Sequence, residues 1–501
     1  MEVEEQLTKL KELLNEIEDI KNAVNLLSWD QQTQMPPGGA NDRGYQVSTL
    51  SGLAHQKFTS PEIGQLLQDL KPYSEQVDPD SNDARLIKVC SREFEKFSRV
   101  PTDLVAEIAQ VTSEAYGVWE EARSESNFSK FQPYLAKIIS LRRQYAECFP
   151  YDHIYDPLLD YYEPGLKTVE VQQIFKILRS KQVEIIQAIG ESQQVDDSFL
   201  KQEFDENKQW EFGVKVISQF GYDWKRGRQD KSTHPFTIRL GHGDVRITTR
   251  VFPDNVTSAL FSSTHECGHA LYEQGIDPAL NRTPLGEGAS YALHESQSRL
   301  YENLISRSRD FWIHFYPKLQ ETFPAQLGNI DLETFYKGIN RVQPSLVRVE
   351  ADEATYNLHI MVRLEMEIAL MEGSLEVADL PDAWNARMQD YLGVSPPDDR
   401  LGVLQDVHWS SGYFGYFPTY ALGNLIASQI WERLKIDMPD LTSQIRSGQF
   451  GELREWLRLN IHQHGMKFDP QEIVERVTGS KVDPSAYLRY LEDKYTEIYA
   501  F

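Results

Sequence analysis

The sequence predicts a large, mostly α-helical protein with one small β-sheet beside its cleft. Apolar residues recur every three or four positions over long stretches, one segment alternates as strands do, and no clear linker divides the chain. The chain has 501 residues, which is enough for one large helical body with a deep core. We therefore expect residues 1–501 to form a single domain.

The N-terminal segment is the clearest predicted helix. Its apolar residues share one helical face and predict core packing: Leu7, Leu10, Leu14, Ile17, Ile20, Val24 and Leu27. The helix should stop at MPPGGAND, where two prolines and two glycines follow one another. Further helices are predicted near residues 103–125, 131–147, 168–192, 346–372, 419–435 and 484–499.

Residues 234–252, HPFTIRLGHGDVRITTRVF, predict a β-hairpin. The segment is rich in β-branched residues and turns at the Gly-His-Gly-Asp run over residues 241–244. In its second half, residues 245, 247 and 249 should face one side of the sheet and residues 246, 248 and 250 the other.

Charge and cysteine content exclude several function classes. The net charge of −25 argues against nucleic acid as a partner, because a phosphate binder needs a basic stripe. Three cysteines are too few for a disulfide framework and suit a reducing cytoplasm. We find neither an apolar run of about 18 residues nor the features of a signal peptide at the N-terminus. We therefore expect a cytoplasmic location and no membrane association.

The run His265-Glu266-Cys267-Gly268-His269 predicts a metal site on a helix over residues 258–274. Two histidines four positions apart lie one turn apart on the same helical face, so both imidazoles can reach one ion. Glu266 would lie beside the ion without binding it. Cys267 is two positions from either histidine, so we expect it to point away as a small core residue. The alternative is a pair of histidines on an ordinary polar helix face.

A catalytic zinc site also needs a third protein ligand and an open position for water. Glu295 is our candidate, because it lies in SYALHESQSRLYENLI. This segment predicts a helix that begins after Ser290 and folds back on the first. His265, His269 and Glu295 would then form the His2Glu set that is typical of catalytic zinc.

Three other residues compete for the third position. Glu273 would have to reach back over a full turn, and Glu287 lies in a loop. His294 offers a nitrogen, but neighbours on a helix point about 100° apart, so His294 and Glu295 cannot both serve.

The charges of such a site predict a hydrolase. Zinc lowers the pKa of a bound water and polarises a carbonyl oxygen. Glu266 can take the proton of that water and later pass it to a leaving amine. The oxyanion that forms then needs hydrogen-bond donors.

Six segments, taken in order, give the sequence a specific resemblance to a known family. They are HPF over 234–236, DVRIT over 244–248, HECGH over 265–269, HESQ over 294–297, RVEAD over 348–352 and GVLQDVHW over 402–409. With these segments the chain resembles the M32 metallocarboxypeptidases, the thermostable carboxypeptidase family of prokaryotes, over nearly its whole length. The stretch WDQQTQMPPGGANDR from Trp29 is also similar. The family usually has Ile or Asn before the arginine of the fifth segment, where this chain has Val347.

The resemblance implies a mostly helical, saddle-like gluzincin fold with a deep groove, related to neurolysin and the angiotensin-converting enzymes. It implies removal of C-terminal residues from peptides, with broad preference and poor action before proline. It also implies Zn²⁺ as cofactor, with Co²⁺ able to substitute, and a homodimer.

Two arginines in the family-like segments are candidates for binding the α-carboxylate of a peptide, which arginine can hold through two parallel hydrogen bonds. Arg348 is our first choice and Arg246 the second. Each could instead be ion-paired within the protein, Arg348 with Glu350 and Arg246 with Asp244.

Related gluzincins place a histidine and a tyrosine against the oxyanion, and the similar stretch here offers His408 and Tyr420, with Tyr416 as the rival tyrosine. An aromatic lining of the core is the alternative for each. His234 could donate to substrate or anchor the hairpin, whose edge could align a peptide as an added strand.

His462 and His464 resemble a second metal pair, but no acidic residue is near in sequence, so we expect a structural role. Two other functions compete with carboxypeptidase activity. One is an oligoendopeptidase or dipeptidyl carboxypeptidase of the same fold. The other is a peptide-binding scaffold without catalysis, against which the presence of Glu266 argues.

Overall fold

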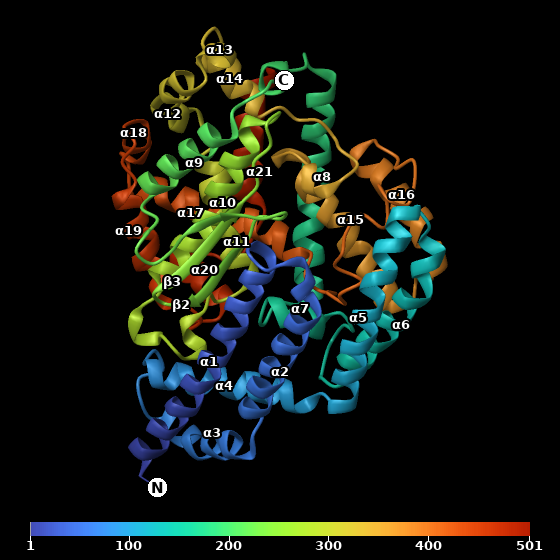
Figure 1. The fold of residues 1–501 in the computed structure, drawn as a ribbon, viewed down its shortest axis with the longest axis vertical. Helices are drawn as coiled ribbons and strands as arrows, with labels where there is room; N and C mark the ends of the chain where they lie inside the picture. Colours follow the sequence, from blue (N-terminus) through green and yellow to red (C-terminus); the bar gives the residue numbers. More distant parts are fainter. Residues whose placement is uncertain (1) are drawn as a thin grey trace.

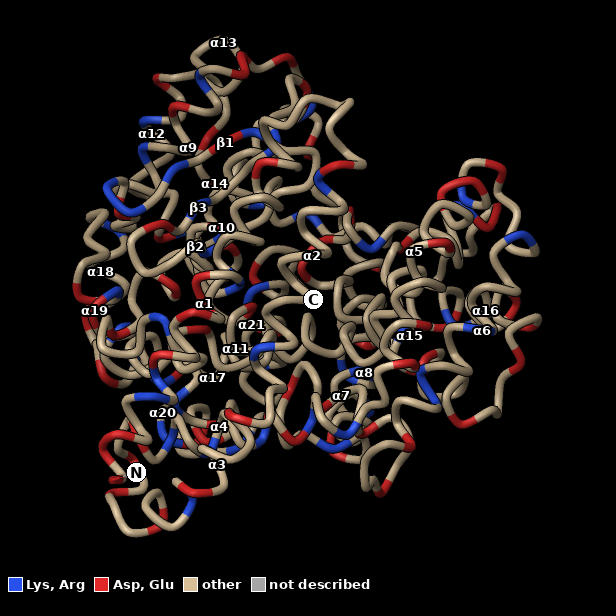
Figure 2. Tube along the Cα trace, turned by 60° about the horizontal axis from the view of Figure 1, so that its bottom comes forward, with Lys and Arg blue, Asp and Glu red and all other residues tan. Residues whose placement is uncertain are grey.

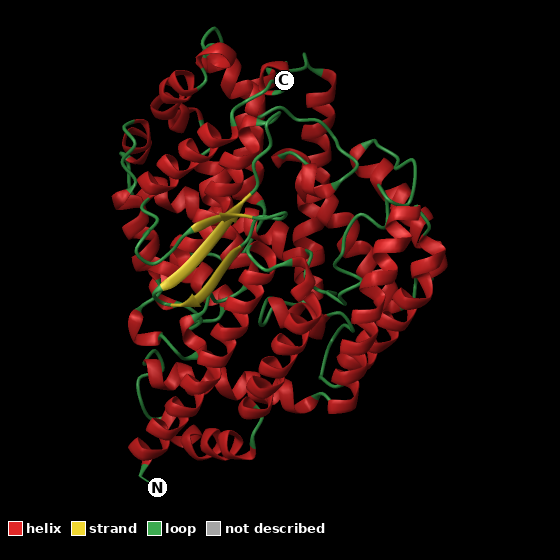
Figure 3. Cartoon of the chain, viewed as in Figure 1, coloured by secondary structure: helices red, strands yellow, loops and turns green. Residues whose placement is uncertain are grey.

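The computed structural model describes residues 2–501 and consists mainly of α-helices around one small sheet (Figure 1, Figure 3). The helices are α1 Val3–Thr33, α2 Ala40–Phe58, α3 Pro61–Ser74, α4 Asn82–Arg99, α5 Thr102–Glu125, α6 Phe128–Glu147, α7 Asp156–Tyr162, α8 Thr168–Glu191, α9 Glu206–Phe220, α10 Val256–Gly275, α11 Tyr291–Arg299, α12 Arg309–Thr322, α13 Pro324–Leu327, α14 Leu332–Ile339, α15 Glu353–Glu372, α16 Leu380–Leu392, α17 Pro418–Asp437, α18 Leu441–Arg446, α19 Gly451–Asn460, α20 Pro470–Thr478 and α21 Ser485–Tyr499.

Most helices predicted from the sequence are confirmed, and the long N-terminal helix shows why. The apolar stripe of α1 is buried from Leu7 to Ile17, and the helix ends at Thr33, just before the Pro-Pro-Gly-Gly run. The prediction over residues 346–372 was wrong at its start. Residues 348–350 form only one 3₁₀ turn, and α15 begins at Glu353. Asp352 fixes this start, because its carboxylate accepts hydrogen bonds from the next free backbone N–H groups.

The predicted hairpin is present, with shorter strands than the segment that predicted it. β2, Thr237–Gly241, pairs antiparallel with β3, Asp244–Thr249. A third strand that the sequence did not reveal, β1 at Gln229–Lys231, pairs parallel with β3. The order β1-β3-β2 leaves β2 at one edge of the sheet. Val245 and Ile247 are fully buried, as the alternation predicted.

The sheet, α10 and α11 lie close to one another in the left half of the view in Figure 1. α10 packs against α9, β2, β3 and α11, and α11 packs against α17. A continuous apolar core extends from Leu7 in α1 to Tyr499 in α21. The two elements that carry the predicted ligands are thus surrounded by packed secondary structure, which restricts their movement.

Acidic and basic residues are interspersed along the chain trace (Figure 2). Within residues 2–501, none of the helices is sufficiently long and apolar to traverse a bilayer.

Candidate metal centre

Two helices bring the predicted ligands together. α10 begins at Asn255, whose side chain accepts hydrogen bonds from two backbone N–H groups of the first turn. α11 begins after Ser290, whose hydroxyl accepts from Leu293 N, so the predicted N-cap is confirmed. The helices touch at Gly268, where a Cβ atom would lie only 2.5 Å from the backbone oxygen of Gln297. Only glycine permits this approach of the backbones.

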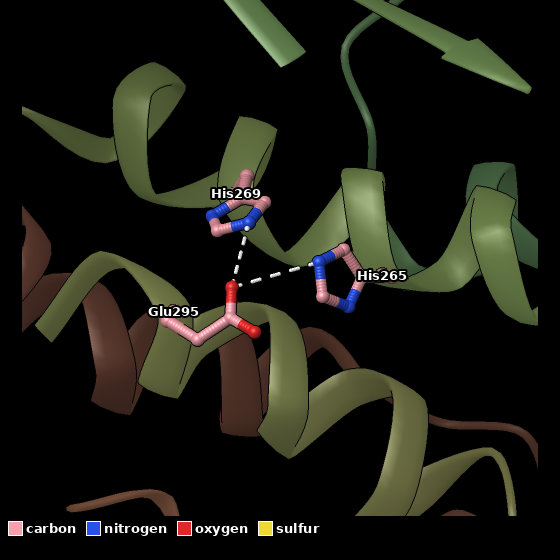
Figure 4. A group of neighbouring side chains, drawn as sticks. All are labelled: His265, His269 and Glu295. Atoms are coloured by element: carbon pink, nitrogen blue, oxygen red, sulfur yellow. Dashed lines mark ion pairs between the residues drawn. The ribbon is translucent and has the colours of Figure 1, made fainter. Parts of the chain in front are cut away.

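The structure places His265, His269 and Glu295 at one point between these helices (Figure 4). One ligand atom of each lies within 4.8 Å of the other two. Glu295 Oε2 lies 3.6 Å from His265 Nε2 and 3.4 Å from His269 Nε2. Among residues 2–501, this is the one group of histidine, cysteine, aspartate or glutamate side chains with the geometry of a metal site.

The outer nitrogens of both imidazoles are occupied by other side chains. His265 Nδ1 lies 2.8 Å from Glu302 Oε2, and His269 Nδ1 lies 2.5 Å from His294 Nδ1. His294 Nε2 is in turn 2.8 Å from Glu273 Oε1. Such contacts fix ring orientation and leave Nε2 of each imidazole directed at Glu295, as metal-binding histidines require.

The charges around the site also suit a cation. Burial alone would raise the pKa of Glu295, but Arg299 and the two imidazoles hold it well below its usual range. Burial lowers the pKa of His269 to about 3, so its imidazole is neutral and has a free lone pair. Two imidazole nitrogens and one carboxylate oxygen are the donor set of catalytic zinc sites. The residues therefore fit a divalent metal.

Glu266 lies beside this group and is held by the sheet. Its Oε2 accepts a hydrogen bond of 2.7 Å from Thr237 Oγ1, which also lies 2.9 Å from the backbone oxygen of Glu266. Burial raises the pKa of Glu266 above its ordinary value. A carboxylate with a raised pKa holds a proton more readily than an ordinary glutamate, as an acid–base group must.

Arg348 is buried and paired, though not with the residue that the sequence indicated. Its Nε and Nη2 donate to Asp406 Oδ1 at 3.0 and 2.9 Å, and its Nη1 donates to Tyr356 Oη at 3.0 Å. Asp406 also pairs with Arg363, so one carboxylate joins two arginines. Glu350 is not part of this network among the contacts of residues 2–501.

Arg246 is paired with Asp244, as the alternative interpretation suggested. Its Nε and Nη2 donate to the two oxygens of Asp244 at 2.8 and 2.7 Å. Its guanidinium also lies over the Trp29 ring, 4.3 Å from the centroid. This contact connects the family-like N-terminal stretch to the sheet. His234 is exposed in the loop before β2, where its backbone oxygen accepts from Ser232 Oγ.

His408 and Tyr420 lie together. His408 Nε2 is 3.3 Å from Tyr420 Oη, and the Tyr420 ring faces the guanidinium of Arg348 at 5.0 Å. Burial lowers the pKa of His408 to about 3, so its imidazole is neutral. Tyr416 lies next to both, with its centroid 5.5 Å from that of His408 and 5.2 Å from that of Tyr420.

The remaining candidates lie elsewhere or have other partners. Cys267 is fully buried, as predicted. Glu273 bonds His294, and Glu287 stays in its loop outside the group of three. His462 and His464 lie in one 3₁₀ turn, where His462 Nε2 is 2.8 Å from Gln297 Oε1.

Sequence reasoning missed two residues that shape the site. Glu302 lies in a π-helical segment, Leu300–Ile305, that continues α11, and nothing in its spacing distinguished it from a surface residue. Gly423 of α17 lets that helix approach the back of α11, since a Cβ there would lie 2.6 Å from Glu295 Cγ. Both effects depend on how the helices cross.

Comparison with known proteins identifies the family. Residues 9–495 match the sequence model of the Carboxypeptidase Taq (M32) metallopeptidase family. The chain belongs to the M32 family. This M32 chain is 42% identical to thermostable carboxypeptidase 1 of Thermus thermophilus over 485 residues, covering 95% of each chain. It is 38% identical to carboxypeptidase 1 of Bacillus subtilis over 501 residues, covering all of both chains.

Solved structures agree. The M32 carboxypeptidase of Deinococcus radiodurans R1 superposes with a TM-score of 0.97 at 41% identity, over 99% of this chain and 100% of that one. Pyrococcus furiosus carboxypeptidase superposes with a TM-score of 0.95 at 34% identity, over 98% of this chain and 99% of that one. The resemblance and the helical fold class are therefore confirmed, and this M32 chain is a metallocarboxypeptidase, a peptide hydrolase.

Proposed function

We propose that this M32 chain is a zinc-dependent carboxypeptidase of broad specificity, poor before proline, with Co²⁺ able to replace Zn²⁺. His265, His269 and Glu295 are the proposed ligands. The observation that carries the proposal is their convergence on one point, with the outer imidazole nitrogens already bonded to Glu302 and His294.

A Zn²⁺ ion held by these three residues would lower the pKa of a water and polarise the carbonyl of the scissile bond. Glu266 accepts the proton of the attacking water and later donates it to the leaving amine. Thr237 keeps the Glu266 carboxyl in place through its 2.7 Å hydrogen bond. The raised pKa of Glu266 suits both halves of this transfer, because the group must gain and lose one proton in each turnover.

Arg348 is our first candidate for the receptor of the substrate α-carboxylate. A guanidinium has five N–H donors, of which Arg348 uses three on Asp406 and Tyr356, so two remain. Arg246 is the second candidate. It uses two donors on Asp244, so three remain. Arg348 is favoured because it faces Tyr420, one of the residues proposed for the oxyanion.

His408 and Tyr420 are proposed to donate hydrogen bonds to the oxyanion that develops on the scissile carbonyl. Their mutual contact and the neutral state of His408 support this, since a neutral imidazole retains one N–H donor. Tyr416 remains the alternative tyrosine, because it lies next to both.

The edge of β2 is proposed to align the peptide backbone as an added strand, with His234 as a further donor. Thr237, at the start of β2, contacts Glu266, so this end of the edge lies beside the reacting groups. The other end is partly covered, since Arg239 O accepts from Asn25 of α1. Only the beginning of β2 is therefore available to substrate.

We further propose that residues 1–501 act as one catalytic domain with a deep substrate groove, and that the protein is a cytoplasmic homodimer. The continuous core supports the first statement. Three free cysteines are consistent with a reducing compartment. The dimer rests on the family resemblance and is tested by light scattering.

The experiment that tests the proposed function is digestion of a mixture of peptides, read by mass spectrometry, with and without a chelator. We expect a ladder that loses one residue at a time from the C-terminus, stops before proline and disappears with chelator. Peptides with an amidated C-terminus should be cleaved far more slowly. Internal fragments, or loss of two residues at each step, would instead identify an oligoendopeptidase or a dipeptidyl carboxypeptidase.

A further inference from the structure

Five tyrosines gather beside the candidate metal centre, and four of them have no role in the proposed reaction. We call Tyr161, Tyr162, Tyr291, Tyr413 and Tyr416 the tyrosine cluster. The Tyr291 centroid lies 5.4 Å from both Tyr162 and Tyr416, and those two lie 5.1 Å apart. Tyr161 packs against Tyr162 at 4.9 Å, and Tyr413 against Tyr416 at 6.2 Å. Most pairs meet edge to face, the arrangement that aromatic rings prefer.

The cluster has one buried side and one exposed side. Tyr162 is buried, whereas Tyr161, Tyr291 and Tyr413 are 53%, 50% and 48% exposed. α7, α11 and the loop over residues 393–417 each contribute to it. Contiguous exposed aromatic surface is uncommon on a protein unless it binds something, and tyrosine rings offer large, rigid contact area. The cluster thus has the composition of a binding surface.

Its position next to the proposed reacting groups follows from α11. Tyr291 precedes Glu295 by four residues, so the two side chains share one helical face. Tyr416 continues the cluster toward His408 and Tyr420, with centroids 5.5 and 5.2 Å away. A peptide held at the metal centre would therefore have the exposed rings within reach of its side chains.

The C-terminal end of α11, opposite Tyr291, indicates in which direction a bound peptide would run. Arg299, at this end, lies over the Tyr356 ring at 4.6 Å from its centroid, and Tyr356 Oη accepts from Arg348. Arg348 and Tyr291 are thus associated with opposite ends of the helix that carries Glu295. If the substrate carboxylate lies at Arg348, the chain that precedes the cleaved bond extends toward the tyrosine cluster.

We propose that the tyrosine cluster binds the side chain of the residue immediately before the cleaved bond, and that it favours an aromatic or large apolar side chain there. This inference rests on the proposed function and deepens it. Ring faces and edges offered by three half-exposed tyrosines suit an aromatic side chain, which gains packing and edge-to-face contact in addition to burial.

The test uses two tripeptides that are blocked at the N-terminus and have a free C-terminal carboxylate. They differ only in the residue before the released one, which is phenylalanine in one peptide and alanine in the other. We expect the ratio of kcat/KM for the phenylalanine peptide to that for the alanine peptide to be about ten. This factor corresponds to the free energy of burying one aromatic ring in contact with others. Tyr291→Ala and Tyr413→Ala should reduce this ratio to roughly one or two, and Tyr291→Phe should preserve it. Phe97→Ala is the control, because Phe97 is similarly exposed but packs on His55 and Phe58 outside the cluster.

A second peptide pair varies only the released residue. If the tyrosine variants change the preference for the released residue and not for the residue before it, the proposed direction of the bound peptide is overturned. If the ratio is already near one in the parent protein, or if Tyr291→Ala lowers kcat/KM for both peptides equally, the cluster is not a subsite. Release of the last residue from the alanine peptide by the parent protein is scored separately. Its absence would refute the proposed function rather than the subsite.

Discussion

His265 Nδ1 and Glu302 Oε2 lie 2.8 Å apart, so a buried carboxylate from the segment after α11 fixes an imidazole of α10. Burial opposes ionisation of Glu302, yet Arg299 and His265 lower its pKa to about 2. A charged carboxylate on Nδ1 sets the ring orientation and makes Nε2 a stronger metal ligand. This contact has a measurable consequence for metal binding.

Glu302→Gln should weaken metal binding about 10- to 100-fold, because the amide retains the shape but not the charge of the carboxylate. The measurement is the Kd for Zn²⁺ by competition with a chromogenic chelator. Glu321→Gln, an exposed position on α12, serves as the matched control. An unchanged Kd in Glu302→Gln would show that this carboxylate does not support the ligand.

Glu266→Gln separates proton transfer from metal binding. We expect the variant to bind the same amount of zinc and to lose about 10²- to 10⁴-fold in kcat, since an amide cannot accept the proton. Mass spectrometry of the metal content checks that zinc binding is retained, and kcat on one tripeptide checks that proton transfer is lost. A variant as active as the parent would overturn the assignment of Glu266 as the base.

The residues that local spacing brings together were predictable, and those that depend on helix crossing were not. His265, His269 and Glu295 follow from a one-turn interval and a helix that folds back. His294 was weighed as a rival ligand, but its place against His269 Nδ1 could not be read from the sequence. Glu302 was equally hidden, since its role depends on the π-helical continuation of α11.

The same reason explains the arginines and the sheet. Asp406 is 58 residues from Arg348, whereas the ion pair considered as an alternative from the sequence was with the nearby Glu350. Ion-pair partners far apart in sequence require the fold to be known. β1 was missed because three residues carry too little alternation to distinguish a strand from a loop.

Arg348→Lys tests the receptor of the substrate carboxylate. Lysine offers a point charge in place of two parallel hydrogen bonds, a difference of about 1.5–3 kcal/mol, or roughly 10- to 150-fold in kcat/KM for peptides with a free carboxylate. Amidated peptides should be much less affected. The measurement is the ratio of kcat/KM for free and amidated forms of one peptide.

Arg246→Lys is the companion variant, and its ratio should change less. If Arg246→Lys abolishes the preference for a free carboxylate while Arg348→Lys keeps it, the order of the two candidates is reversed. Melting temperatures of both variants show whether loss of the Asp406 or Asp244 pair has disturbed the fold.

The buried carboxyl group of Glu163 should make the stability of the protein depend on pH, whether or not a metal is bound. It is fully buried, accepts a hydrogen bond from Ala292 N at the start of α11, and burial raises its pKa to about 8. An exposed glutamate titrates near pH 4.3. Because the folded protein holds this proton more tightly, the stabilisation is complete below roughly pH 4 and is lost as the pH rises through about 8.

Glu163→Gln should remove that loss, because the amide oxygen still accepts from Ala292 N and carries no charge at any pH. The free energy of unfolding of the parent should fall by an amount on the order of a few kcal/mol between pH 5 and 8.5, relative to the variant. Urea unfolding at several pH values measures it. Parallel pH profiles for the two proteins would contradict the burial of a protonated Glu163.

Anomalous X-ray diffraction from crystals of the zinc-loaded protein tests the central claim most directly. The account predicts one strong zinc peak within about 2.0–2.2 Å of His265 Nε2, His269 Nε2 and a Glu295 oxygen, with one coordination position free of protein. A peak bound by other residues, or zinc that leaves Glu295 beyond bonding distance, would contradict it.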